Sequence, residues 1–508
     1  MAADTKHPKG LYILFFTEMW ERFSYYGMRA LLMLYMTKAL LFDTSFASGL
    51  YGNYTGLVYL TPLIGGYISD RYWGNRRSIF VGGIIMAIGQ FLLFGSGSVL
   101  SAEPATAKIL FGLGLTALVI GNGFFKPNIS TMVNQLYPPG DKKVDAAFSI
   151  FYMGINLGAF FSPLICGTLG DTGNPNDFKW GFLAAGIGMV VGLFFFEIFK
   201  NKYVVTADGK PVGMKPEKKT VIEENSQDKS EFGMGRILVW LAIYAVLWIF
   251  FLLVVKFNVV STLIFATSLA ASGFIITDPT LSKIERQRIW VVYLIAFFVI
   301  FFWSAFEQAG ASLTLFADQQ TDRNISGWEM PASWFQSVNP LAIVVFAPLL
   351  AMLWIRLGKK NNEPPSPIKQ SIGMFLLAIG YLIIAFGVKG VDGKTKVSMM
   401  WLSSMYVVHT LGELCLSPIG LSMVARLAPA RLASLLMGVW FMSNSMANDF
   451  AGMLSKLYPE GGHAKDLLGI HIGNMYDFFM FFVVMAGVAS VILFLLSKKL
   501  LQMMHGIR

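Results

Sequence analysis

The stretch TEMWERFSYYGMR, residues 17–29, places charged side chains inside an apolar segment long enough to cross a membrane. The apolar runs LYILFF and ALLMLYM flank it. At about 100° per residue, its polar positions share one face of a helix; they are Glu18, Glu21, Arg22, Tyr25 and Arg29. A charge at the bilayer centre costs roughly 2.5–3.5 kcal/mol. This face therefore needs a wet cavity or charged partners.

The composition excludes a soluble protein. The 508 residues are 55% hydrophobic and 14% charged, with a mean hydropathy of +0.58, whereas soluble chains carry about 25% charged residues. The net charge of +10 would indicate a nucleic-acid partner in a soluble chain, but membrane topology explains it here and we expect no such partner. Cys166 and Cys415 have neither metal-ligand spacing nor a disulfide pattern, so we expect no metal site.

Hydropathy predicts an all-α integral membrane protein with 14 transmembrane helices. The predicted spans are 11–36, 50–70, 79–99, 107–132, 145–168, 180–199, 236–256, 259–277, 289–317, 332–357, 368–388, 397–425, 431–456 and 473–501. An even number of spans puts both termini on one side. Of the 40 Lys and Arg residues, 27 fall on that side and 10 on the other. The positive-inside rule therefore predicts that both termini are cytoplasmic.

The loops divide the spans into two sets of six and one inserted pair. We predict a cytoplasmic N-terminus at 1–10, a six-helix bundle at 11–199, a cytoplasmic linker at 200–235, two additional transmembrane helices at 236–288, a second six-helix bundle at 289–503 and a cytoplasmic C-terminus at 504–508. Two helical halves around a central cavity form a transporter architecture, with the substrate near the bilayer midplane.

Other predicted spans also contain polar side chains, namely Lys126, Asn156, Glu307, Asn339 and Glu413. An asparagine inside a span often joins helices, and the charges of the first span could form a buried ion-pair network that only locks helices together. Together, however, the intramembrane charges comprise three cations and four carboxylates. This near balance favours a zwitterionic ligand plus one titrating carboxylate over an anion channel, which needs surplus cations.

Three motifs resemble the proton-dependent oligopeptide transporters, a branch of the major facilitator superfamily. EMWERFSYYG matches the motif E-x-x-E-R-F-x-Y-Y-G, and FYMGINLGAF matches the second signature of the family. GGYISDRYWGNRR is similar to the superfamily's loop between spans two and three. The inserted pair of spans resembles that of prokaryotic members. The resemblance therefore implies a major facilitator fold of two six-helix bundles plus two extra inserted helices, in a bacterial inner membrane.

The resemblance also implies a function and residue roles. The protein would be a proton-coupled symporter that imports di- and tripeptides by alternating access, clamping the substrate termini between the two bundles. Proton coupling is assigned to Glu18, Glu21 and Arg22; the substrate carboxylate to Arg22, Arg29 and Lys126; its ammonium to Asn156, Asn339 and Glu413; and side-chain pockets to Tyr25, Tyr26, Tyr59, Trp303, Trp440 and Ser417. Gating is assigned to the pairs Lys126–Glu307 and Arg29–Asp318, and to Asp70 and Arg71.

Animal members use a second-span histidine where this chain has Gly52, so we expect carboxylates to carry the proton. A substrate carboxylate that competes for Arg22 would leave a glutamate without its counter-charge, which favours proton uptake. Besides protons we expect no cofactor, and besides peptides and the lipid bilayer no partner; the chain is expected to be a monomer. No residue cluster has the spacing of an enzyme site. The alternative is a proton-coupled carrier of another small anion such as nitrate, on the same fold.

Overall fold

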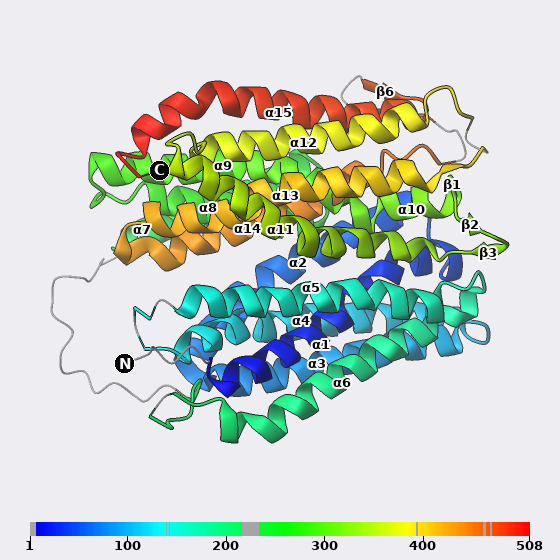
Figure 1. Ribbon diagram of the computed structural model, residues 1–508, viewed down its shortest axis with the longest axis horizontal. Coiled ribbons are helices and arrows are strands. Elements are labelled where there is room, and N and C mark those ends of the chain that lie inside the picture. Colours follow the sequence, from blue (N-terminus) through cyan, green and yellow to red (C-terminus); the bar gives the residue numbers. More distant parts are fainter. Residues whose placement is uncertain are drawn as a thin grey trace.

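A computed structural model shows two helical bundles that lie side by side. The structure describes residues 7–138, 140–141, 143–206, 208–215, 233–392, 395–460, 464–467 and 470–507. α1 begins and α15 ends at one end of the molecule, and most of the short strands lie at the other (Figure 1). These are called the terminal end and the distal end below.

The first bundle contains the helices that precede the linker. They are α1 (Lys9–Leu34), η1 (Tyr35–Ala39), α2 (Thr44–Ile68), η2 (Ser69–Trp73), α3 (Asn75–Val99), α4 (Pro104–Gln135), α5 (Lys143–Gly170), η3 (Pro175–Asp177) and α6 (Phe178–Tyr203). α1 packs against α5 and α6, while α3 packs against α4 and α6. The polar stripe of α1 is buried, because neighbouring helices cover the face that the sequence pattern singled out.

The second bundle follows an inserted pair of helices. The pair is α7 (Met234–Ile249), η4 (Phe250–Val254) and α8 (Val259–Ile276); the bundle is α9 (Lys283–Phe306), η5 (Glu307–Gly310), α10 (Ser312–Gln319), η6 (Ala332–Ser337), α11 (Val338–Lys359), α12 (Ser366–Gly387), α13 (Met399–Leu427), η7 (Ala430–Leu432), α14 (Ala433–Ser455) and α15 (Met475–Met503). α12 packs on α13 and α15, and α14 packs on α9. α7 has no fully buried residue, whereas α8 packs against α14 and α2.

In the described part of the chain, strands are short and lie in the loops between helices. They are β1 (Thr321–Asp322), β2 (Asn324–Ile325), β3 (Trp328–Glu329), β4 (Val397–Ser398), β5 (Lys465–Leu467) and β6 (Ile470–Ile472). β1 pairs with β4 in parallel, in the register Thr321 to Val397, whereas β2–β3 and β5–β6 are antiparallel hairpins. They connect the second bundle's helices at the distal end and leave the all-helical class unchanged.

A helix occupies each of the 14 predicted spans, with ends that differ by a few residues. The largest difference is in the ninth span, which the chain crosses as α9, a short 3-10 turn and α10 rather than as one helix. Eleven described helical segments are long and apolar enough to span a membrane by themselves. α1, α2 and α14 are not among them, yet they cross the bundles beside the others (Figure 1).

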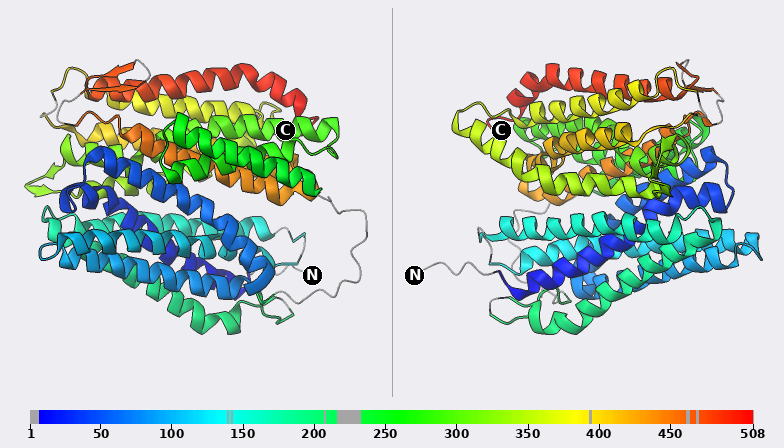
Figure 2. Two further views of the ribbon diagram at one scale, coloured as in Figure 1. Left: turned by 180° about the vertical axis from the view of Figure 1, so that it is seen from behind. Right: turned by 45° about the vertical axis from the view of Figure 1, so that its right-hand side comes forward.

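The two bundles meet in the distal half of the molecule. α2 crosses α14 so closely that a Cβ on Gly452 would lie 2.5 Å from the Cα of Gly52. Ser445 Oγ donates to the Gly56 carbonyl at 2.6 Å, and the Ser48 and Ser455 hydroxyls are 3.1 Å apart. Small residues on both helices permit this approach. We call the α2–α14 contact the distal seam; the opposite view in Figure 2 shows α2, in blue, running between the bundles.

The terminal end of the first bundle is covered by the start of the predicted linker. Residues 205 and 211 form an isolated β-bridge, and the buried Arg76 guanidinium holds this hairpin. It donates to the Val212 and Val204 carbonyls, both at 2.5 Å, and to Asn201 Oδ1 at 2.9 Å. Residues 216–232 of the predicted linker lie outside the described residues.

We predict that Arg76→Ala lowers the free energy of unfolding by about 1–3 kcal/mol, because buried carbonyls lose their donor. Arg77 is the matched control: it is exposed and rests on the Trp73 ring, so Arg77→Ala should change stability by less than about 0.5 kcal/mol. Thermal unfolding of the purified variants measures both. Equal shifts would show that the contacts of Arg76 carry no stability.

Candidate functional site

A cavity of about 330 Å³ lies between the two bundles. α1, α2, α4 and α5 contribute to one wall, and α9, α11, α13 and α14 to the other. It has the size and the mainly apolar lining of a small-molecule site. Eleven of the residues singled out by sequence line it: Tyr26, Arg29, Tyr59, Lys126, Asn156, Trp303, Glu307, Asn339, Glu413, Ser417 and Trp440.

The first-helix charge cluster lies behind this cavity. Glu18 and Arg22 are each 3% exposed and Glu21 is fully buried. Arg22 Nε lies 3.0 Å from Glu18 Oε1 and also forms an ion pair with Glu21. Within the described chain, Glu18 Oε2 and Arg22 Nη2 have no hydrogen-bond partner. Two carboxylates thus share one guanidinium, which leaves one negative charge that a proton can neutralise.

Two charged groups face the cavity without an opposite charge beside them. Lys126 Nζ lies 4.0 Å above the Tyr59 ring centroid, and none of the ion pairs in the described chain includes it. On the other wall, Glu413 Oε2 accepts from Asn339 Nδ2 at 2.8 Å, and the same amide donates to Thr410. A cation on one bundle and a carboxylate on the other make the cavity dipolar.

Neither predicted gating pair, Lys126–Glu307 or Arg29–Asp318, is formed in this conformation; because such pairs open and close with access, their gating role stays a prediction. Arg29 Nη2 pairs with Glu307 Oε2 at 2.6 Å, and Asp318 Oδ1 pairs with Lys38 Nζ at 2.5 Å. The reason is depth: at 1.5 Å per residue, Lys38 lies about 14 Å beyond Arg29 along the first span. Asp318 lies similarly far beyond Glu307 along η5 and α10, so each cation meets the carboxylate at its own level.

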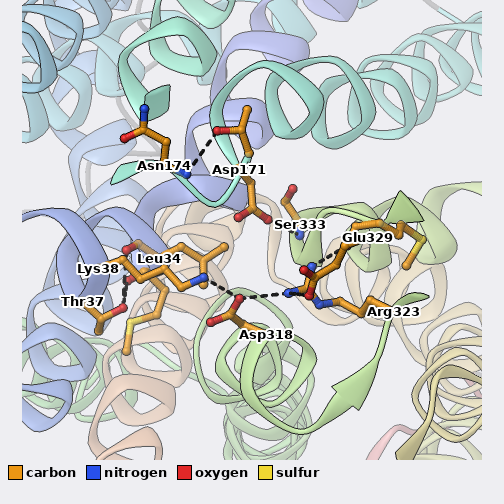
Figure 3. A network of polar contacts seen from close by, with 12 residues as sticks. Leu34, Thr37, Lys38, Asp171, Asn174, Asp318, Arg323, Glu329 and Ser333 are labelled. Carbon is orange, nitrogen blue, oxygen red and sulfur yellow. Dashed lines mark hydrogen bonds and ion pairs between the residues drawn. The ribbon is translucent and has the colours of Figure 1, made fainter. Parts of the chain in front are cut away.

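Asp318 belongs to an ion-pair network at the distal end, shown in Figure 3. Besides Lys38 of the first bundle, it contacts Arg323 Nη2 at 3.3 Å, and Arg323 in turn pairs with Glu329 at 2.9 Å. Asp171, beyond the end of α5, accepts from the Ser333 amide at 3.4 Å. Burial raises the pKa of Asp171. The network therefore joins the two bundles at the end away from the chain termini.

The remaining predicted site residues are in different surroundings. Tyr25 is buried beside the Arg22 guanidinium, 5.4 Å from ring centroid to carbon, and does not line the cavity. The Asn156 amide donates to the Tyr152 carbonyl of its own helix at 2.9 Å. Asp70 and Arg71 are exposed at the terminal end, where Arg71 donates to Tyr67 Oη. The gating role of these two residues stays a prediction.

Sequence reasoning missed several residues of the cavity and the distal network. Tyr152, Gln336, Tyr406 and Asn448 line the cavity. Tyr152 is the second residue of the quoted signature FYMGINLGAF, and its helical spacing of four from Asn156 could have identified it. Lys38 and Arg323 lie at the distal ends of spans, where a basic residue is ordinarily taken as a topology signal.

Comparison with known proteins supplies an independent observation. The model of the POT family matches residues 76–468. Peptide transporter YePEPT of Yersinia enterocolitica is 37% identical, with 90% of this chain and 88% of that protein aligned. An uncharacterized transporter of Bacillus subtilis, YclF, is also 37% identical over 89% of each chain. Dipeptide and tripeptide permease A of Erwinia pyrifoliae is 31% identical, over 98% and 95%.

Solved structures give the same result. A mutant of peptide transporter POT in complex with alafosfalin superposes with a TM-score of 0.79 at 32% identity, covering 99% of this chain and 97% of that one. A POT family transporter in complex with 5-aminolevulinic acid superposes with a TM-score of 0.78 at 33% identity, covering 98% of both chains. The similarity therefore includes both bundles and the inserted helices.

We predict that the distal ion pairs hold the seam closed. A cysteine at Ser48, which is fully buried in the seam, serves as the reporter, labelled from the distal side by a membrane-impermeant maleimide. Lys38→Gln should raise the labelling rate by up to about five-fold, since a partly exposed pair contributes about 1 kcal/mol or less. Asp318→Asn should raise it further, because Lys38 loses its partner and Arg323 loses one of its two carboxylate partners.

The matched control is Lys108→Gln, which removes an exposed cation near the distal start of α4 that rests on the Phe42 ring. This variant should leave the labelling rate unchanged. Unchanged labelling in the Lys38 and Asp318 variants would mean that packing alone closes the seam.

Proposed function

The chain belongs to the POT family, and from this premise we propose that it is a proton-coupled symporter that imports di- and tripeptides by alternating access. Its relatives include peptide transporters that match it over most of their length. The chain has the fold of the major facilitator superfamily, two six-helix bundles with two extra helices. It is a multi-pass membrane protein, and its substrates bind in the cavity between the bundles.

The observation that carries this proposal is the dipolar cavity. Every unmodified peptide has an ammonium at one end and a carboxylate at the other, whatever its sequence. Lys126, supported by Arg29 and Arg22, binds the carboxylate; Glu413, Asn339 and Asn156 bind the ammonium. The tyrosines and tryptophans of the lining then contact varied side chains without requiring a particular one. Nitrate, the alternative ligand, would leave Glu413 uncompensated.

Proton coupling follows from the shared guanidinium of Arg22. A substrate carboxylate that draws Arg22 or Lys126 toward the cavity leaves Glu18 and Glu21 with less counter-charge in a buried site. One of them then takes up a proton, so that substrate and proton favour each other's binding. The drive is about 1.4 kcal/mol per pH unit plus about 2.3 kcal/mol per charge for each 100 mV.

The orientation that fits this function puts the terminal end in the cytoplasm of a bacterial inner membrane, as the excess of Lys and Arg predicts. The distal end is then extracellular and closed, and Asp70 and Arg71 belong to the gate that closes the cytoplasmic side. The chain acts as a monomer, since both walls of the cavity are formed by the same chain. Protons are the coupling ion, and no other cofactor is needed for this mechanism.

The test is uptake of labelled dialanine into proteoliposomes with an inward proton gradient and a negative-inside potential. We expect concentrative uptake that a protonophore abolishes, that unlabelled peptides inhibit, and that free alanine and nitrate do not. Glu21→Gln should lose gradient-driven accumulation yet retain peptide exchange, because the substrate contacts remain. Full pH-driven uptake by this variant would contradict the coupling role, and inhibition by nitrate would favour the anion carrier.

A second prediction assigns the two termini of the peptide to the two bundles. Lys126→Ala should weaken dialanine binding by about 10–100-fold, the effect of losing a charged contact of 1.5–3 kcal/mol. It should affect dialanine amide, which has no carboxylate, far less. Glu413→Gln should weaken the binding of dialanine strongly. It should hardly change the binding of N-acetyl dialanine, which has no ammonium. Equal losses for blocked and unblocked peptides would contradict the assignment.

A further inference from the structure

Asp449 is a buried carboxylate that the transport site does not use. It lies on α14 near the distal end, is 2% exposed, and its Oδ2 has no hydrogen-bond partner in the described chain. None of the ion pairs between described residues includes it. It is also absent from the lining of the cavity. A side chain of this kind, in this position, requires an explanation.

The residue stands at the distal seam, where three helices meet. A Cβ on Gly56 of α2 would lie 3.3 Å from the Cβ of Asp449, and a Cβ on Gly52 would lie 2.9 Å from its carbonyl oxygen. α8 closes the third side: Ser261 hydrogen-bonds to the carboxylate and leaves its Oδ2 without a partner, and Ile264 reaches toward Gly56. The carboxylate is thus enclosed by α2, α8 and α14, and a separation of α2 from α14 would open one side of this enclosure.

Within the described chain, no cation forms an ion pair with Asp449. α2 and α8 contain no Asp, Glu, Lys, Arg or His; their titratable side chains nearest the seam are the tyrosines Tyr51 and Tyr54 of α2. On the side of α9, Gln308 donates to the Ala451 carbonyl, while Glu307 is paired with Arg29. The cation that acts on Asp449 is Lys456, which follows α14 and forms no ion pair with it.

Burying an ionised carboxylate without a paired cation is strongly unfavourable, so the group neutralises instead. We propose that Asp449 is a further proton-binding residue of the transport cycle, protonated while the distal seam is closed. When α2 and α14 separate, water enters, the O–H bond breaks and the proton passes to water on the distal side. This inference rests on the proposed alternating-access function. Protons outside the cell therefore promote closure of the seam.

This role differs from that of the first-helix glutamates. Asp449 does not reach the cavity, so its proton exchanges with the distal side alone and does not accompany the peptide. It is a positioning residue of the distal gate, and its substitution should change the pH dependence of closure rather than the affinity for peptide.

The test measures the seam directly by electron–electron resonance between spin labels. Leu41→Cys and Glu460→Cys, both exposed at the distal end, carry the labels in a background without Cys166 and Cys415. In the otherwise native protein, we expect long distances to become more populated as the pH rises from about 5 to about 8. Asp449→Asn, which is neutral at every pH, should reduce the long-distance population at the higher pH by about three-fold or more.

Two further variants separate protonation from packing. Asp449→Glu should keep the pH response, and Asp466→Asn, which neutralises an exposed carboxylate in a distal loop, should leave it unchanged. If Asp449→Asn does not fold, Asp449→Ser provides the same neutral comparison. An Asp449→Asn response equal to that of the native residue, or no response in either, would overturn the proposal. Dialanine uptake in the same vesicles tests the transport function separately.

Discussion

The requirement that buried charges be compensated determines most of this structure. Apart from Asp449 at the distal seam, seven charged side chains lie within the spans around the cavity, and the described chain compensates them unequally. Arg29 and Glu307 neutralise each other across the two bundles, whereas Arg22 serves two glutamates. Lys126 and Glu413 face the cavity without an opposite charge beside them. The uneven pairing creates the site, because a ligand must carry an anionic group for Lys126 and a cationic group for Glu413.

The pairing also explains how substrate and proton can act on one another. Under the proposed assignment, a peptide supplies the missing anion to Lys126 and the missing cation to Glu413, and so changes the balance around Arg22 and the first-helix glutamates. Contacts between the bundles depend on the same charges, since Arg29 and Glu307 come from opposite sides. Binding, protonation and the relative position of the bundles are therefore linked through a small number of ions rather than through a long pathway.

The sequence was sufficient for the class, the number of helices and the members of the cavity that carry a full charge, Arg29, Lys126, Glu307 and Glu413. The charge stripe of α1 predicted a buried polar face, and hydropathy located the spans, including α1, α2 and α14, whose own composition does not mark them as spanning segments. It was insufficient for the partners within the site. Pairing depends on depth in the membrane, and the break between α9 and α10 at Glu307–Gly310 is what sets the depth of Glu307 and Asp318. The seam was also missed, since small residues give no periodic signal.

The crossing of α2 and α14 at Gly52 and Gly452 has a mechanical consequence. On α2, the segment from the crossing to the distal start is eight residues, about 12 Å, whereas the segment to Ile68 is about 24 Å. On α14 the arms differ more, since the crossing lies three residues from Ser455 and 19 from Ala433. The crossing is therefore a pivot point, with a short segment of each helix on its distal side and a longer segment on the opposite side. A tilt that separates the distal arms only slightly moves the opposite arms at least twice as far, so a small opening at the distal end accompanies a larger displacement at the terminal end.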